Sequence, residues 1–318
     1  MKKIGLSVYL FKVSEKRRGK EKNNILNINN IEGRSFLDIL LDFFKEYEGQ
    51  YDDDKKKENI FTTIKTDKKE AKDEDGRLKY GYVWSYIKTG DYGTVSEIVN
   101  ADTGETSYNK KENDAEVIPF VCGIMLPSGE RDNGIIIFQT EGKYGMKSCF
   151  ESRLKKYLMK NYRHFSFEMG PLLPTQYIEK VLKKGVLEKI RLIRFQTPAD
   201  IKNTLSVNEG TEMKEERIYY RPTGFINNKL DKIVGYIRGK NGLREVITDE
   251  NFNYDLIKMD FKIGNRKRTF DFNNIEKIVP IIDITEEVKS IAEHPDYVLV
   301  KNEIEKTALE FWEEMQPS

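Results

Sequence analysis

A short acidic segment near the C-terminal end of the sequence has the residue types of a metal-dependent nuclease. Asp283 precedes Glu287-Val-Lys289, and two carboxylates with a nearby lysine can hold a divalent ion and activate water against a phosphodiester. That chemistry needs the Glu-x-Lys pair on a strand beside the first carboxylate, whereas this segment has the pattern of a helix start. A metal-dependent nuclease, or another effector that acts on nucleotides, is therefore an alternative function.

Histidine and cysteine are too sparse for a metal centre or a catalytic triad. A zinc site needs three or four clustered nitrogen or sulfur ligands, and the chain offers only His164, His294, Cys122 and Cys149. Lys147 near Cys149 could lower the pKa of that thiol, but a buried structural thiol is the favoured interpretation. We predict no metal, no cofactor and no catalytic residue.

A glycine-rich turn between an expected strand and an expected helix indicates contact with phosphate. Residues 139–147 contain two glycines and two lysines, and the N-terminus of a helix attracts anions through its unpaired N–H groups. The spacing matches neither a P-loop nor a dinucleotide-binding fingerprint. The turn therefore predicts a contact with a phosphate backbone more than a specific nucleotide site.

The segregation of charge is the main functional signal. The chain has 54 basic and 53 acidic residues, a net charge of +1, yet residues 143–196 carry 13 basic and 4 acidic residues, a net charge of +9. Tyrosines are interleaved with these cations, a combination typical of surfaces that bind phosphates and stack on bases. A basic hairpin tip at residues 266–268 could contact nucleic acid as a β-ribbon does. The predicted nucleic-acid-binding residues are Lys143, Lys147, Arg153, Lys155, Lys156, Lys160, Arg163, Lys183, Lys184, Lys189, Arg191, Arg194, Arg266, Lys267 and Arg268.

The elements that must position these residues indicate an α+β fold with a large, mainly antiparallel sheet, packed helices and a smaller C-terminal α+β part. Ser35 is the expected N-cap of a helix, with Asp38 completing a capping box. The charge runs at residues 48–58 and 67–77 are expected to be solvated loops. Strands are predicted at 3–13, 59–65, 79–88, 95–99, 105–110, 117–126, 134–140, 186–196, 217–221, 255–263 and 268–272, and helices at 35–49, 145–160, 175–184, 226–238 and 303–315. The strands at 95–99 and 105–110 are expected to form a hairpin around a turn at 100–104, and those at 117–126 and 134–140 a second hairpin. The continuous apolar run at 135–138 indicates a strand covered on both faces.

A polar, acidic stretch at residues 204–216 predicts a boundary between a domain of residues 1–203 and a domain of residues 204–318. The tail at 285–318 has 3 basic and 9 acidic residues, and the region 35–116 has 13 basic and 20 acidic residues. Either segment could compete with nucleic acid for the basic block, within one chain or between the chains of a homodimer. A truncation that removes residues 285–318 is then expected to bind DNA more tightly.

Several classes of protein are disfavoured by composition. No stretch approaches 18 consecutive apolar residues, the length of a membrane-spanning helix. The first residues lack the apolar core of a signal peptide, and two cysteines cannot form a disulfide scaffold. We therefore expect a cytoplasmic protein.

The order of elements between residues 115 and 200 resembles the RexA and KwaB type of phage-exclusion and phage-defence proteins. The resemblance covers about a third of the chain, and it is carried by residues 118–124, 134–139, 145–154 and 181–192. It implies DNA binding without strong sequence preference, a membrane-embedded partner protein and a role in prokaryotic antiphage defence. It contains no diagnostic catalytic motif and has no counterpart to the acidic runs at 48–77, so it implies no residue roles.

Together these observations predict a cytoplasmic, non-enzymatic protein that binds DNA or RNA with weak sequence preference in antiphage defence. The nuclease is one alternative. The other is a protein-interaction or inhibitor module that docks partners through its separate acidic and basic faces.

Overall fold

The computed structural model describes residues 3–16, 24–172, 175–195, 214–237, 239–240, 242–249, 252–263, 266–272, 281–288 and 295–315. The chain is an α+β protein with a large antiparallel sheet, as predicted. It divides into two compact units: unit 1 consists of Met1–Leu172 and Val279–Ser318, and unit 2 of Leu173–Ile278.

Unit 1 is built on a sheet with the strand order β11-β1-β9-β8-β5-β4-β3, to which β2, β10 and β16 add short pairings. Neighbouring strands are antiparallel throughout this order. The predicted hairpin of β8 and β9 is confirmed. The strands are β1 (Ile4–Glu15), β2 (Asn24–Ile25), β3 (Asp52–Asp54), β4 (Asn59–Lys72), β5 (Leu78–Asp91), β8 (Glu116–Pro127), β9 (Gly134–Glu141), β10 (Tyr144–Gly145), β11 (Phe165–Pro171) and β16 (Ile281–Asp283).

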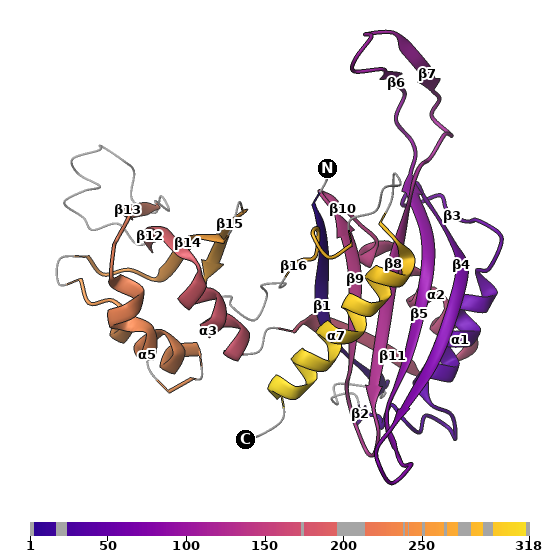
Figure 1. Cartoon of the computed structure of the whole chain (residues 1–318), viewed down its shortest axis with the longest axis horizontal. Helices are drawn as coiled ribbons and strands as arrows, with labels where there is room; N and C mark the ends of the chain where they lie inside the picture. Colours follow the sequence, from indigo (N-terminus) through magenta and orange to yellow (C-terminus); the bar gives the residue numbers. More distant parts are fainter. Residues whose placement is uncertain are drawn as a thin grey trace. The chain divides into compact units, whose positions relative to one another are not determined.

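Helices cover both faces of this sheet (Figure 1). On one face, α1 (Phe36–Glu46) and α2 (Lys147–Asn161) pack on a core that includes Phe120 and Cys122 of β8. Because successive strand residues point to opposite faces, Gly123, which follows Cys122, faces the other side. There α7 (Tyr297–Met315) approaches so closely that a Cβ on Gly123 would lie 2.3 Å from Ile304. This two-sided cover explains why Ile135–Phe138 of β9 are continuously apolar and buried, as predicted.

The start of α1 is capped by Ser35, as predicted, but the capping box is incomplete. The Ser35 hydroxyl accepts a hydrogen bond from the Leu37 N–H at 3.3 Å. Asp38, the expected reciprocal partner, instead accepts a hydrogen bond from the Lys68 ammonium at 3.1 Å.

The charge runs predicted as solvated loops are in part strands, so that prediction is wrong. Residues 67–72 extend β4, paired with β5 as far as Lys72 opposite Leu78, and residues 52–54 form β3. Their charged side chains find partners on other elements: Lys69 pairs with Glu305 of α7 at 2.6 Å. A strand can therefore contain many charged residues in succession when helices packed on the faces of its sheet supply the opposite charges.

The predicted hairpin between residues 95 and 110 is confirmed as an arm that projects from the sheet (Figure 1). Its strands, β6 (Ser96–Val99) and β7 (Thr106–Lys110), form a two-stranded sheet of their own. The turn is closed by the Asn100 side chain, which accepts from the Asp102 N–H at 2.9 Å, and by Gly104 in the left-handed region.

Unit 2 has a four-stranded antiparallel sheet, β13-β12-β14-β15, with helices packed on one face. The predicted boundary after residue 203 would cut this sheet, because β12 precedes that position and pairs with both β13 and β14 beyond it. The predicted C-terminal domain is also wrong in its last helix, because α7 packs on strands of unit 1. The elements are α3 (Thr175–Lys184), β12 (Val186–Arg194), β13 (Glu215–Tyr220), α5 (Phe225–Ile237), α6 (Leu243–Val246), β14 (Leu256–Ile263) and β15 (Arg266–Asp271).

None of the helices that the structure describes is long and apolar enough to span a bilayer.

Candidate nucleic-acid interface

The predicted basic block is divided between the two units. Its first part, Lys143 to Arg163, belongs to unit 1, and its second part, Lys183 to Arg194, belongs to unit 2. Each part must therefore be judged by its own surroundings.

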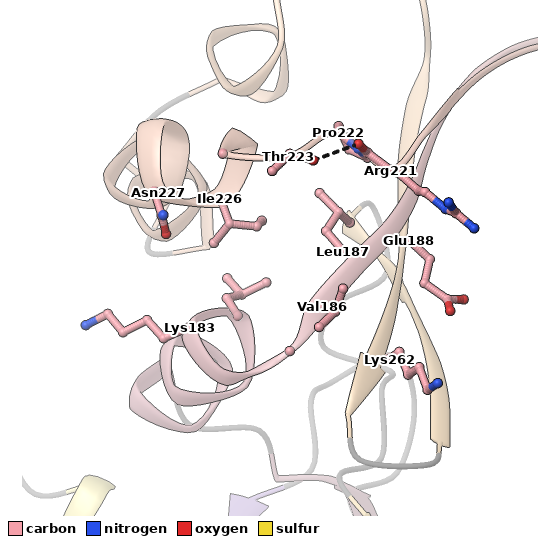
Figure 2. Close-up of a pocket in the computed structure, with 13 residues that line it drawn as sticks. Lys183, Val186, Leu187, Glu188, Arg221, Pro222, Thr223, Ile226, Asn227 and Lys262 are labelled. Carbon is pink, nitrogen blue, oxygen red and sulfur yellow. Dashed lines mark hydrogen bonds between the residues drawn. The ribbon is translucent and has the colours of Figure 1, made fainter.

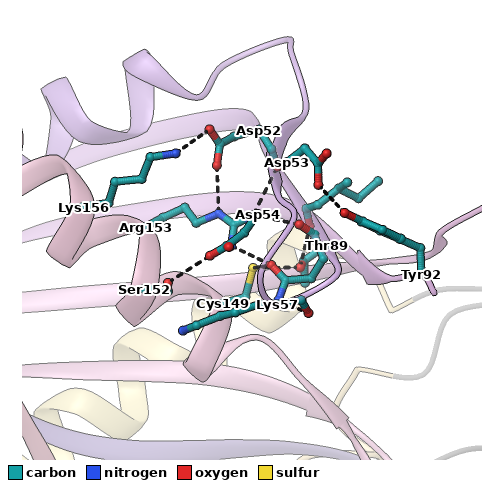
Figure 3. Close-up of polar contacts among 12 residues, drawn as sticks. Asp52, Asp53, Asp54, Lys57, Thr89, Tyr92, Cys149, Ser152, Arg153 and Lys156 are labelled. Carbon is teal, nitrogen blue, oxygen red and sulfur yellow. Dashed lines mark hydrogen bonds and ion pairs between the residues drawn. The ribbon is translucent and has the colours of Figure 1, made fainter. Parts of the chain in front are cut away.

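Arg153 has a structural role, although it was expected on the binding surface. Its side chain is completely buried, and Figure 3 shows it beside the carboxylates of Asp52 and Asp54. The guanidinium pairs with Asp52 at 3.1 Å and Asp54 at 3.5 Å, and it donates to the Asn59 side-chain oxygen at 2.6 Å and main-chain oxygen at 2.9 Å. A cation enclosed in this way has no surface to offer a phosphate.

The other cations of α2 are exposed but paired within the chain. Two of their carboxylate partners, Glu46 and Asp52, come from the acidic region 35–116, which was expected to compete for these cations. Exposed pairs of this kind contribute at most about 1 kcal/mol, but they neutralise the field that would attract a polyanion. The pairs are Lys147–Glu151 (3.4 Å), Lys155–Glu151 (2.7 Å), Lys156–Asp52 (3.2 Å) and Lys160–Glu46 (2.9 Å).

The glycine-rich turn at residues 139–147 closes the tight β9–β10 hairpin, with Gly142 in the left-handed region. The Lys143 ammonium lies 5.2 Å from the centre of the Tyr144 ring, and the Lys147 ammonium lies 5.2 Å from that of Tyr9. Arg163 is exposed beyond the end of α2. These three cations are dispersed, and they do not converge on one cavity.

The acidic tail is also a structural element. Helix α7 pairs with β4 through Glu305 and Lys69, and through Lys301 and Asp67 at 3.6 Å. Tyr297 at the start of the helix donates to Asp67 at 3.1 Å. These contacts tie the tail to the sheet of unit 1, away from the cations of α2 on the opposite face.

The candidate hydrolytic residues do not form a metal site in the described part of the chain. Asp283 is exposed on β16 and accepts from the Thr285 hydroxyl at 2.6 Å. Glu287 is exposed in the following turn, and Lys289 lies outside the described residues. Among the residues that the structure describes, no three His, Cys, Asp or Glu side chains are grouped to hold a metal ion.

The thiol of Cys149 is buried beside Thr89, whose hydroxyl lies 3.1 Å from the sulfur. Burial raises the pKa of Cys149, and it also raises the pKa of Cys122. Because the pKa is raised and not lowered, the thiols stay protonated at neutral pH. His164 is exposed and lies 2.8 Å from Glu32, and His294 is outside the described residues.

Both thiols are therefore expected to resist alkylation in the folded protein. Only the thiolate reacts, and burial both suppresses ionisation and blocks access. Mass spectrometry after treatment with iodoacetamide at neutral pH should show little labelling of either cysteine, and complete labelling in guanidinium chloride. Rapid labelling of Cys149 in the folded protein would show an accessible, activated thiol instead.

In unit 2, the cations of β12 are paired across the sheet. Arg191 binds Asp260 at 2.7 Å, and Lys189 lies 3.6 Å from the same carboxylate. Arg194 pairs with Glu215, and its guanidinium lies 4.7 Å from the ring centre of Phe252. Lys189 and Arg191 face outward, whereas Arg194 shares a side of β12 with the buried Ile190 and Leu192, so its predicted outward position is wrong. The charge of all three cations is compensated within the unit.

Three other cations of unit 2 line one groove, which we call the α3–α5 groove (Figure 2). Lys183 lies on one side, and Arg221 and Lys262 lie on the other, with the apolar side chains of Val186, Leu187 and Ile226 between them. The groove has a volume of about 580 Å³. Its lining residues are Leu182, Lys183, Gly185, Val186, Leu187, Glu188, Arg221, Pro222, Thr223, Gly224, Ile226, Asn227 and Lys262.

The rim cations of the α3–α5 groove differ from those of β12 in their pairing. In the part of unit 2 that the structure describes, Lys183, Arg221 and Lys262 have no ion-pair partner, and all three are exposed. Glu188 is the one carboxylate among the described lining residues. The rim therefore carries an excess of uncompensated positive charge.

The groove is formed by turns at the ends of secondary elements. Helix α3 ends at Lys184, and β12 begins two residues later. Arg221 adopts a left-handed conformation with φ of 47°, uncommon for a non-glycine residue, and its N–H donates to the Glu188 carbonyl at 2.7 Å. This turn directs the chain from β13 into α5 and leaves the Arg221 side chain at the rim.

Of the three rim cations, Lys183 was predicted from the sequence as a binding residue, and Arg221 and Lys262 were not. Both lie outside the block 143–196, and only the fold brings them together. Lys262 reaches the groove because β14 pairs with β12, where it stands opposite Val186. The signal that could have found it is the alternation of Lys258, Asp260 and Lys262 on one face of a predicted strand.

Exposed aromatic and apolar side chains adjoin the groove on β13. Tyr220 is 71% exposed, the most of any tyrosine among the described residues, and it immediately precedes Arg221. In the sheet it stands opposite Lys189, whose ammonium lies 5.9 Å from the ring centre. Tyr219 and Ile218 are also exposed.

The remaining predicted residues flank this site. Lys184 is exposed at the end of α3. Arg266, Lys267 and Arg268 lie on β15, and Lys267 stands opposite Lys262 in the register. The first two were predicted at the tip of the hairpin, and that prediction is wrong because their backbone pairs with β14. Their side chains, and the tip of the hairpin, lie outside the described residues.

No protein-family model matches the chain, and no curated protein matches it either. The fold and the groove thus define the class of protein in structural terms: an α+β chain whose smaller antiparallel unit carries a cationic groove with an apolar floor.

Proposed function

We propose that the chain binds single-stranded DNA or RNA through the α3–α5 groove of unit 2. One observation carries this proposal: three cations that have no ion-pair partner among the described residues rim a single groove, while the neighbouring cations of β12 are neutralised by carboxylates. Phosphates supply the dominant, sequence-independent part of nucleic-acid affinity. Because contacts with phosphates do not read the bases, we expect weak sequence preference.

The apolar floor favours a single strand over a duplex. A duplex presents phosphates at its surface but keeps the faces of its bases stacked, whereas an unpaired base can place its face on apolar or aromatic side chains. Val186, Leu187 and Ile226 offer such a surface inside the groove, and Tyr220 offers another beside it. The volume lies within the range of pockets that hold small organic groups.

The test is the binding of a fluorescent oligonucleotide of about 12 nucleotides, a length within the site sizes of single-strand binders. Anisotropy titrations should give tighter binding to the single strand than to the matched duplex, with the oligonucleotide intact in the presence of Mg²⁺. Equal or tighter binding to the duplex would contradict use of the apolar floor. Degradation that depends on Mg²⁺ would favour the nuclease alternative.

Replacing Tyr220 with alanine should weaken binding by about 1–3 kcal/mol, the usual contribution of one base–aromatic contact. The salt dependence should be unchanged, because no phosphate contact is lost. Tyr108→Ala is the matched control, since Tyr108 is an exposed tyrosine of unit 1. If both substitutions weaken oligonucleotide binding equally, or if neither weakens it, Tyr220 does not supply the stacking contact.

The resemblance to phage-defence proteins supports one further part of the proposal, a role in antiphage defence. The efficiency of phage plating on cells with and without the chain tests it. A reduction that disappears in a Lys183→Ala, Arg221→Ala, Lys262→Ala variant would link that role to the groove, and no reduction with the unaltered chain would count against it.

A further inference from the structure

A second groove lies in unit 1 at the base of the β6–β7 arm, and we call it the tyrosine groove. It is open and has a volume of about 780 Å³. Three tyrosines contribute to its lining, and Tyr51 and Tyr108 are about half exposed. The lining residues are Tyr51, Asp53, Lys55, Ile60, Tyr92, Tyr108, Asn113, Asp114, Ala115 and Val117.

Two of the three tyrosines are held by carboxylates. The Tyr92 hydroxyl donates to Asp53 at 2.8 Å, as Figure 3 shows, and the Tyr108 hydroxyl donates to Asp114. The hydrogen bond to Asp53 raises the pKa of Tyr92 to about 12, so this hydroxyl remains a donor at neutral pH. Each pair anchors a ring at its hydroxyl end and adds a negative charge beside it.

The arm above the groove is both acidic and apolar. Residues 91–116 contain seven acidic and two basic residues, a net charge of −5. Val95 is 74% exposed, and Ile98 and Val99 are about half exposed on β6. A two-stranded hairpin is marginally stable by itself, so this arm would gain from a partner that covers its apolar residues.

We propose that the tyrosine groove and the β6–β7 arm dock a segment of a partner protein in which lysine or arginine alternates with apolar residues. A cation over a tyrosine ring is attracted by the negative face of the ring, and Asp53 and Asp114 add charge complementarity. The apolar residues of the same segment would cover Val95, Ile98 and Val99. The cation of the lining, Lys55, is offset by Asp53. A nucleic acid does not fit this surface, because its phosphates would be repelled by the net charge of −5 on residues 91–116.

The probe that tests this docking site is a labelled octapeptide of alternating lysine and valine, with an octapeptide of alternating glutamate and valine as its charge-reversed control. The full chain should bind the lysine peptide and not the glutamate peptide. The Tyr51→Ala, Tyr108→Ala double variant should lose at least about tenfold in affinity, the equivalent of about 1.4 kcal/mol. Asp53→Asn with Asp114→Asn should lose a similar factor.

Two control variants separate a specific groove from general attraction. Asp75→Asn removes an exposed charge of unit 1 outside the lining of the groove, and Tyr220→Ala removes an exposed tyrosine of unit 2. Both should bind the lysine peptide as the unaltered chain does, with unchanged circular dichroism for every variant. The proposal is overturned if the lysine peptide does not bind, if the glutamate peptide binds equally, or if the control variants lose as much affinity as the groove variants.

Discussion

Replacing Arg153 with alanine is expected to lower the free energy of unfolding of unit 1 by about 3–5 kcal/mol, the usual cost of removing one partner from a buried ionic network. The substitution would leave Asp52, Asp54 and the Asn59 side chain without the donor that joins them. Denaturant titration followed by circular dichroism measures the change. Asp52 and Asp54 are one-quarter exposed, so water can solvate them in part, and the lower end of the range is expected.

Lys155→Ala is the matched control for Arg153→Ala. It removes a cation from the same helix, but one whose side chain is 53% exposed and paired only with Glu151, one turn earlier. Such a pair contributes about 0.2–0.5 kcal/mol. Equal stability of the two variants would contradict a structural role for Arg153. If the Arg153→Ala protein is fully stable but no longer binds nucleic acid, Arg153 is part of the binding surface.

Removing helix α7 is expected to abolish cooperative folding of unit 1. Val300, Ile304 and Phe311 are buried against the sheet, and at about 1.5–3 kcal/mol each their loss would remove much of the 5–15 kcal/mol that typically stabilises a folded protein. The truncated chain would also expose Trp84, now fully buried. Gel filtration, binding of a hydrophobic dye and circular dichroism should report an expanded or aggregated protein.

The sequence hypothesis that the acidic tail competes with nucleic acid predicts tighter DNA binding after truncation. A truncation that unfolds unit 1 does not isolate this effect, because it changes the fold as well as the charge of the tail. The charge of the tail can be tested without unfolding the protein. Glu310 and Glu313 are exposed on α7, and replacing both with glutamine should leave the affinity for an oligonucleotide unchanged. A folded truncation, or tighter binding by the glutamine variant, would support autoinhibition.

The elements of the fold were largely predictable because apolar periodicity and local signals are encoded within short windows. The apolar face of α1, the β8–β9 hairpin and the turn at Asn100 each depend on residues within one segment. The continuous apolar run at 135–138 correctly indicated a strand covered on both faces. The strand formed by residues 67–72 was missed because its stabilising partners, Asp38 and Glu305, lie in helices distant in sequence.

The candidate site was predictable only in part, for the same reason. A count of lysines and arginines cannot tell which cations are neutralised, since pairing depends on carboxylates about 100 residues away, as with Arg153 and Asp52. Conversely, Arg221 and Lys262 looked ordinary in the sequence, and the pairing of β12 with β14 places Lys262 across the same groove from Lys183. The net charge of a segment thus overstated the uncompensated charge on α2 and did not reveal the unpaired cations described at the α3–α5 groove.

The central claim is that the rim cations of the α3–α5 groove contact phosphates. It is tested most directly by the salt dependence of single-strand binding for the unaltered chain and for the Lys183→Ala, Arg221→Ala, Lys262→Ala variant. Each phosphate contact contributes about 0.7 to the slope of log affinity against log salt for a single strand, so the variant should lose a slope of about 2 while keeping its circular dichroism. A Lys155→Ala, Lys156→Ala, Lys160→Ala variant of α2 should retain the full slope. The claim is contradicted if the groove variant keeps its slope, or if the α2 variant is the one that loses it.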